Sequence, residues 1–211
     1  MNVAIIQTGT ANIASVRVAF ERLGVCPRLV SDPRQISNNE ALVLPGVGSF
    51  AAGMKALRDN NWIDVLRERV TQDQPLLSIC LGLQMLCTES DEAPGVEGLR
   101  ILPAAVRKLP GTVSLPHFGW NTITSDSPTL PSGFVYYANS FGVTELDAIQ
   151  QAGWSIATTT YGTTFVAAVR KASILACQFH PELSGAFGSQ LISDWLTRAK
   201  KRIDEQRGVS C

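Results

Sequence analysis

The first half of the chain alternates short apolar runs with segments of helical spacing, and this alternation limits the possible fold more than any other feature. Residues 3–7, 27–31 and 41–44 are apolar runs with the length of buried strands. Residues 11–23 carry apolar side chains at helical intervals and are followed by Gly24, a residue typical of helix C-termini. Strands that are separated by helices in this way predict a parallel sheet with helices on both faces.

The second half has a different pattern, with short β-branched and aromatic runs separated by turn residues. This pattern predicts additional antiparallel strands. We therefore expect one α/β domain over residues 1–203, built on an open and mostly parallel sheet with flanking helices and with antiparallel strands added in the C-terminal half. Its last helix is expected over residues 185–203, and polar residues 204–211 are expected to form a frayed tail. The strands predicted in this half are residues 100–108, 120–124, 134–139 and 154–160, and the pair 165–170 and 173–179, which flank residues 171–172 like a hairpin.

Charge and cysteine content exclude several classes of protein. Lysine plus arginine and aspartate plus glutamate each number 18, so the formal net charge is zero, and the one basic cluster, residues 198–202, falls on the predicted last helix. This balance argues against a nucleic-acid-binding protein. The five cysteines are odd in number and irregularly spaced, and no signal peptide or membrane-spanning apolar run is visible. A reducing cytoplasm is the expected compartment, with no membrane association.

Residues 75–86, with the sequence P-L-L-S-I-C-L-G-L-Q-M-L, join a predicted strand directly to a predicted helix. Cys80 falls at the turn, and Gly82 permits the tight backbone path that presents a nucleophile in many α/β enzymes. A cysteine at the N-terminus of a helix also favours the thiolate, which is the reactive form. The same stretch is equally compatible with a buried structural cysteine at the end of a core strand, since free cysteine is among the most buried residue types.

His180 is one of only two histidines and follows an apolar run. In parallel-sheet enzymes, functional groups gather at this end of a strand. Pro181 favours an extended backbone at His180, and residues two apart in an extended chain point to the same side, so Glu182 can reach the imidazole. With Cys80 these residues predict a catalytic triad in which Glu182 orients His180 and His180 moves the proton. A strand-end turn with an incidental histidine is the alternative.

Two further patterns lie next to predicted strands. The run P-G-V-G at residues 45–48 can turn a backbone N–H toward a reacting oxygen, and it is equally compatible with a plain tight turn. Cys177 and His180 are three residues apart, but two ligands on one strand end cannot close a tetrahedral site. No metal is therefore expected.

Taken together, these motifs resemble the class I glutamine amidotransferase family. Its signature is a cysteine elbow of the form G-x-C-x-G-x-Q followed by a later H-P-E, and the chain has I-C-L-G-L-Q at 79–84 and Q-F-H-P-E at 178–182. Within the family the chain is similar to the glutaminase subunits of imidazole glycerol phosphate synthase, an enzyme of histidine biosynthesis. This narrower resemblance is carried by T-G-x-x-N at 8–12, P-G-V-G at 45–48 and P-H-F-G-W-N at 116–121, and it covers residues 1 to about 200.

The resemblance implies a glutaminase that uses no cofactor. Cys80 would attack the side-chain amide of glutamine and release ammonia, and water would then hydrolyse the γ-glutamyl thioester. His180 would move the protons, and Glu182 would orient His180. By their match to family positions, the backbone of Gly46, Val47, Gly48 and Leu81 would hold the oxyanion, and Gln84, Glu92, Ser140 and Phe141 would hold the amino-acid end of glutamine.

The resemblance also implies a partner, a cyclase subunit of (βα)8-barrel fold that forms a heterodimer with this chain. Ammonia would pass unhydrated to the cyclase, which makes imidazole glycerol phosphate and aminoimidazole carboxamide ribotide. The glutaminase would stay nearly silent until the cyclase binds its ligand. Asn12, Trp120 and Asn121 would face the barrel. From its residues alone, the run around His117 and Trp120 is also compatible with a packed turn.

Four positions depart from the family pattern. Ser78 replaces the usual glycine two residues before the nucleophile, and Asn139 replaces a frequent histidine. Phe141 stands where the family has an aromatic residue that bears a hydroxyl group, and Leu183 stands where a basic residue is common. None is a triad position, so these departures bear on the interface and on coupling to the cyclase. The alternatives are another class I subunit, such as that of anthranilate or aminodeoxychorismate synthase, a non-catalytic α/β binding module, and a cysteine peptidase.

Overall fold

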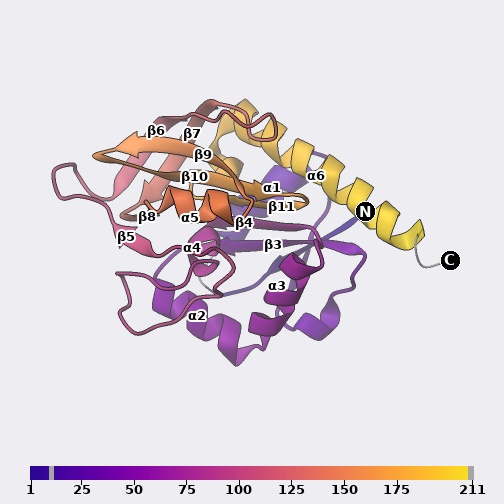
Figure 1. Ribbon diagram of the computed structural model, residues 1–211. Coiled ribbons are helices and arrows are strands. Elements are labelled where there is room, and N and C mark those ends of the chain that lie inside the picture. Colours follow the sequence, from indigo (N-terminus) through magenta and orange to yellow (C-terminus); the bar gives the residue numbers. More distant parts are fainter. Residues whose placement is uncertain (10–11, 209–211) are drawn as a thin grey trace.

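A seven-stranded sheet forms the middle layer of the computed structural model, which describes residues 1–9 and 12–208 (Figure 1). The strand order is β2-β1-β3-β4-β11-β10-β9. The first five strands of this order run parallel, and β10 and β9 add antiparallel pairs at one edge. The predicted α/β fold with a mostly parallel sheet is therefore confirmed. The strands are β1 (Asn2–Ile6), β2 (Arg28–Val30), β3 (Glu40–Gly46), β4 (Leu76–Cys80), β9 (Ser155–Tyr161), β10 (Thr163–Lys171) and β11 (Ile174–Cys177).

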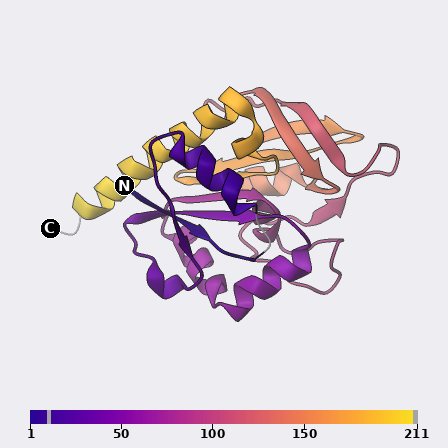
Figure 2. The same ribbon diagram turned by 180° about the vertical axis from the view of Figure 1, so that it is seen from behind.

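Helices cover both faces of this sheet, because its central strands are apolar on both sides. Helices α2, α3, α4 and α5 pack on one face (Figure 1), and α1 and α6 pack on the other (Figure 2). No helix in the described part of the chain is long and apolar enough to cross a membrane. The helices are α1 (Ile13–Glu21), α2 (Phe50–Asp59), α3 (Trp62–Thr71), α4 (Leu81–Met85), α5 (Leu146–Gln151) and α6 (Gly185–Gly208), with 3-10 turns η1 (Pro33–Gln35) and η2 (Pro181–Leu183).

Two small antiparallel sheets accompany the central one. The β6–β7 pair packs its inner side chains into the same core as α1 and α6, whereas the β5–β8 pair joins the opposite core. These pairs, together with β9, β10 and β11 of the central sheet, account for the strands predicted in the second half of the chain. Their bounds are β5 (Val106–Lys108), β6 (His117–Ile123), β7 (Gly133–Asn139) and β8 (Phe141–Val143).

The last helix is longer than the sequence pattern predicted. It continues to Gly208 rather than ending near residue 203. Contacts with the turn before β4 hold these final turns, since Gln206 Nε2 donates a hydrogen bond to the backbone oxygen of Gln72 at 3.4 Å and Arg202, one turn earlier, donates from Nε to the backbone oxygen of Asp73 at 3.1 Å. Residues 209–211 of the predicted tail lie outside the described residues.

Three parallel strands bring their carboxyl ends together at one edge of the sheet. Gly46 at the end of β3 is in register with Cys80 at the end of β4, and Cys177 at the end of β11 is in register with Ile79. His180 lies three residues after the end of β11 and directly precedes η2. Segments that are far apart in the sequence therefore converge where functional groups of parallel-sheet enzymes are found.

Candidate active site

Cys80 is held in an unusual backbone conformation at the junction of β4 and α4. Its φ is +53° and its ψ is −108°, and the helix begins at the next residue, Leu81. Such a conformation is strained for a residue other than glycine and is retained only where the surrounding structure enforces it. Gly82 makes the sharp turn possible, because a Cβ at this position would lie 2.1 Å from the backbone oxygen of Leu44.

Ser78, which departs from the family pattern, fits the strand that leads to the elbow. It is fully buried and stands in register between Leu44 of β3 and Ala176 of β11. Its hydroxyl has no hydrogen-bond partner, so the serine is tolerated at the cost of a buried unsatisfied polar group. The elbow geometry at Cys80 is thus compatible with a serine two residues before it.

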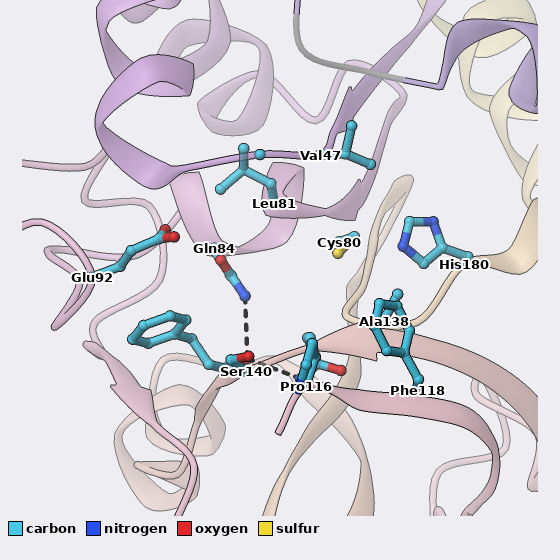
Figure 3. Close-up of a pocket in the computed structure, with 13 residues that line it drawn as sticks. Val47, Cys80, Leu81, Gln84, Glu92, Pro116, Phe118, Ala138, Ser140 and His180 are labelled. Carbon is cyan, nitrogen blue, oxygen red and sulfur yellow. Dashed lines mark hydrogen bonds between the residues drawn. The ribbon is translucent and has the colours of Figure 1, made fainter. Parts of the chain in front are cut away.

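His180 and Glu182 lie in contact beside the elbow. His180 has the extended backbone that Pro181 favours, and its Nδ1 is 2.8 Å from Oε1 of Glu182. Both side chains are buried. A carboxylate in this position fixes the tautomer and the orientation of the imidazole. The other nitrogen, Nε2, is left for the Cys80 side, and Figure 3 shows the imidazole ring beside Cys80.

The charge of His180 is set by competing effects. Burial lowers the pKa of His180, but the hydrogen bonds with Cys80 and Glu182 and the negative charge of both partners outweigh burial and raise it to about 10. The imidazole is therefore charged at neutral pH. Helix α4 spans only Leu81–Met85, so its dipole is weak, and the imidazole of His180 is the main charged group beside the sulfur.

Glu182→Gln should lower the pKa of His180, because glutamine keeps the shape of the side chain and removes its negative charge. The chain has only two histidines, so an NMR titration can follow both. In the unmodified chain we expect one midpoint near pH 10 for His180 and one below the ordinary value for His117, whose pKa burial lowers. The first midpoint should fall in the variant and the second should stay. An unchanged midpoint for His180 would show that Glu182 does not raise the pKa of the imidazole.

A cavity of about 320 Å³ opens over Cys80 and His180 (Figure 3). Most of the residues predicted to bind or activate a substrate line it, whereas Gly46 and Glu182 are not among the lining residues. In the described part of the chain no cluster of three or more histidine, cysteine or acidic side chains is suited to a metal ion. The lining residues are Val47, Gly48, Cys80, Leu81, Gln84, Glu92, Pro116, Phe118, Ala138, Asn139, Ser140, Phe141 and His180.

Four of these lining residues were not predicted for the pocket. Pro116 and Phe118 belong to a motif that was assigned to the partner surface, and Ala138 carried no chemical signal. Asn139 was noted as a departure from the family pattern, and its Nδ2 donates to the backbone oxygen of Phe141 at 2.9 Å. All four lie on β6 or β7 or directly beside β6.

Gln84 presents an acceptor to the cavity. Its Nε2 donates to the backbone oxygen of Phe141 at 3.2 Å and to Oε1 of Gln178 at 3.1 Å. Both N–H groups are therefore used within the protein, and the carbonyl oxygen Oε1 is left for a ligand. Glu92 adds a carboxylate to the same cavity while its Oε2 accepts a hydrogen bond from the backbone N–H of Phe50 at 2.7 Å. Two acceptors of this kind suit an ammonium group.

The predicted oxyanion residues surround the cavity side of the elbow. Leu81 is the first residue of α4, so its backbone N–H has no acceptor within the helix and is free to face a ligand. Gly48 has a φ of +97°, a left-handed conformation that favours glycine. Gly46 packs directly under Leu81, because a Cβ there would lie 2.8 Å from the Leu81 Cβ.

The three residues predicted to face a partner have different surroundings. Asn12 is exposed and caps α1 by accepting a hydrogen bond from the N–H of Ser15 at 3.3 Å. Asn121 donates from Nδ2 to the backbone oxygen of Thr160 at 3.1 Å, so its amide nitrogen is engaged within the chain. Trp120 is 51% exposed on β6. It therefore belongs to the surface rather than to a packed turn.

His117, by contrast, is packed in the interior, although it lies in strand β6 rather than in a turn. Its ring is buried and stacks against Tyr137 and Tyr161, with ring centres 4.8 and 3.9 Å away. Strand β6 thus places His117 inward and Trp120 outward. Leu183, which replaces a common basic residue of the family, is 40% exposed on η2 and makes that surface less polar.

Comparisons with known proteins agree with this geometry. A model of the family glutamine amidotransferase class-I matches residues 5–199. The chain is 39% identical over 193 residues to the imidazole glycerol phosphate synthase subunit HisH of Exiguobacterium sibiricum, an alignment that covers 92% of this chain and 93% of that protein. It is 38% identical over 203 residues to the subunit of the same name from Yersinia pseudotuberculosis, with 93% and 99% covered.

A solved structure shows the same fold. A crystal structure described as a glutamine amidotransferase superposes with a TM-score of 0.74, covering 94% of this chain and 99% of that chain at 22% identity. At this identity the likeness concerns the fold alone, and the sequence matches carry the assignment. This chain belongs to the class I glutamine amidotransferase family.

Proposed function

We propose that this chain is the glutaminase subunit of an imidazole glycerol phosphate synthase. The observation that carries the proposal is the cavity in which Cys80, in a strained elbow, stands beside the charged imidazole of His180. The relatives from Exiguobacterium sibiricum and Yersinia pseudotuberculosis, which match almost the whole chain, support the choice of synthase.

In the proposed reaction the Cys80 thiolate attacks the side-chain carbonyl carbon of glutamine. The backbone N–H groups of Leu81 and of Val47 and Gly48, which follow β3, stabilise the resulting oxyanion. The tetrahedral intermediate collapses as His180 gives its proton to the leaving nitrogen, which departs as ammonia. His180 then takes a proton from water, and the hydroxide formed hydrolyses the γ-glutamyl thioester to glutamate. Glu182 holds the imidazole in place during both steps.

Substrate selection follows from the polar groups at the far end of the cavity. Gln84 Oε1 and the Glu92 carboxylate are proposed to accept hydrogen bonds from the α-ammonium group of glutamine. The backbone around Ser140 and Phe141 completes this end of the pocket. A free amino acid satisfies these groups, whereas a residue within a peptide has no ammonium group to offer them, and this disfavours a cysteine peptidase.

The partner is proposed to cover an apolar surface that borders the cavity. Phe118, which lines the cavity, is 67% exposed, and on the same β6–β7 sheet Trp120 stacks against the exposed Phe134 with ring centres 6.3 Å apart. Exposed aromatic clusters of this kind mark binding surfaces. We propose that a cyclase subunit docks here and receives ammonia from the cavity.

The direct test is an ammonia-release assay on the full chain, alone and with the cyclase subunit and its ligand. We expect slow hydrolysis of glutamine by the chain alone and clear acceleration in the complex. Absence of ammonia under both conditions would reject the glutaminase assignment. Equal turnover under both conditions would reject only the coupling to the cyclase.

Trp120→Ala should weaken the complex with the cyclase about 30-fold, because truncating a central interface aromatic typically costs roughly 2 kcal/mol. Leu29→Ala is a matched control, since Leu29 is an exposed apolar residue on β2, at the edge of the sheet farthest from β9. The dissociation constant is measured by calorimetry and the fold by thermal unfolding. Equal affinities of the two variants would remove Trp120 from the interface.

A further inference from the structure

Gln178 contacts the sulfur of Cys80. It follows β11 and is completely buried, and the sequence patterns gave it no separate role. Its Nε2 lies 3.7 Å from Sγ of Cys80, a distance at which an N–H donates to sulfur. The buried amide is thus one of the groups in direct contact with the reacting atom.

The hydrogen-bond network fixes which end of this amide faces the sulfur. The backbone oxygen of Phe141 is only an acceptor, so the group that Gln84 directs at it must be Nε2. Nε2 of Gln84 also lies 3.1 Å from the side-chain amide of Gln178. Because this nitrogen is a hydrogen-bond donor, the atom of Gln178 that faces it must be the acceptor, Oε1. This leaves Nε2 of Gln178 for Cys80. The backbone carbonyl of Phe141 thus fixes the orientation of both side-chain amides, and with it the N–H group that faces the sulfur.

We propose that Gln178 is a further catalytic residue, which donates a hydrogen bond to the Cys80 thiolate and ties it to the substrate-binding amide of Gln84. This inference rests on the proposed glutaminase function. A thiolate accepts a hydrogen bond much better than a thioester sulfur, so the donor stabilises the sulfur before attack and again when it leaves during hydrolysis of the thioester. No proton is transferred through Gln178, because a carboxamide stays neutral.

Charged groups near the sulfur act in parallel with this neutral donor. His180 contacts Cys80 directly, Glu182 acts through His180, and Glu92 lines the same cavity. These groups are unchanged when only Gln178 is replaced. A shift in the titration of Cys80 that follows such a replacement therefore reports the lost donor.

The test is the alkylation of Cys80 by iodoacetamide as a function of pH, measured by peptide mass spectrometry on the full chain. Gln178→Met keeps the length of the side chain and removes the donor. We expect the midpoint of the Cys80 profile to rise by roughly one pH unit, since a hydrogen bond to a charged group has about that effect. Cys26 is exposed and serves as an internal reference whose profile should not change.

Three further readouts separate the proposed role from a structural one. Phe179→Leu perturbs an adjacent buried residue that is not a hydrogen-bond donor to the sulfur, and it should leave the Cys80 midpoint in place. Cys177 is buried, so it should remain unreactive in every folded variant. In the ammonia assay Gln178→Met should lower kcat more than it raises KM, because the donor contacts the sulfur rather than the substrate.

Several outcomes would overturn the inference. An unchanged Cys80 midpoint in Gln178→Met, or an equal shift in Phe179→Leu, would show that the amide does not act on the sulfur. Alkylation of Cys177 in Gln178→Met would assign Gln178 to the fold instead. Alkylation needs no glutamine, so these results do not depend on the proposed glutaminase function. That function is tested separately, by the ammonia assay on the unmodified chain.

Discussion

Replacing Cys80 by alanine is expected to lower ammonia release from glutamine by about 10⁴-fold or more, because the reaction then has no nucleophile. The substitution removes a single sulfur atom at the edge of a cavity, so the fold should persist. Glutamine should still bind, since Gln84 and Glu92 are unchanged. Ammonia release is measured in the complex with the cyclase, and glutamine binding by calorimetry.

Cys26→Ala is the matched control for this experiment. Cys26 is an exposed free cysteine outside the cavity, and its loss should leave ammonia release unchanged. Retained glutamine hydrolysis in Cys80→Ala would refute the assignment of the nucleophile. An equal loss in both variants would point to a general effect of cysteine replacement.

Gly82→Ala is expected to destabilise the protein by about 3 kcal/mol, because the new methyl group would overlap a backbone atom that cannot move aside. The added Cβ would lie 2.1 Å from the backbone oxygen of Leu44 in the neighbouring strand β3. The elbow must open to relieve this contact, so Cys80 should leave its position and ammonia release should fall as well. The free energy of unfolding is measured by urea denaturation.

Gly111→Ala provides the comparison for Gly82→Ala. A Cβ on Gly111 would meet nothing within 4 Å, so the free energy of unfolding should change by about 0.5 kcal/mol or less. If Gly82→Ala were as stable and as active as Gly111→Ala, the close approach of Gly82 to the backbone oxygen of Leu44 would not limit the residue type at the elbow.

Local sequence was sufficient to predict the parallel half of the fold. Strands β1, β3 and β4 are buried on both faces and therefore appear as continuous apolar runs, each followed by a helical segment. The elbow was also visible locally, because Cys80 and Gly82 stand at fixed positions between a strand and a helix. The contact between His180 and Glu182 was predicted from an extended chain, but only His180 is extended and Glu182 lies in the 3-10 turn η2. The turn still brings Oε1 of Glu182 to 2.8 Å from Nδ1 of His180.

The cavity wall formed by β6 and β7 was less predictable. Whether Phe118 lines the cavity or points away depends on how these strands cross the sheet edge, and that arrangement is set by distant packing. The expected strand over residues 100–108 was too long for a related reason. Pro103 has no backbone N–H to donate to a neighbouring strand, so pairing begins only at Val106.

Long-range polar contacts left no local signal at all. The amide nitrogen of Asn121 is engaged by Thr160, and that of Gln178 by the sulfur of Cys80, nearly a hundred positions away. A polar residue in a sequence does not reveal which group it will meet. These contacts become visible only when the fold brings the partners together.

Chemical quenching of the complex during turnover of glutamine, followed by peptide mass spectrometry, detects the proposed γ-glutamyl thioester itself. We expect a γ-glutamyl group on the peptide that carries Cys80, present while glutamine lasts and absent after it is consumed. Ammonia release with no acyl group on Cys80, or with the acyl group on another cysteine, would contradict the proposed role of Cys80.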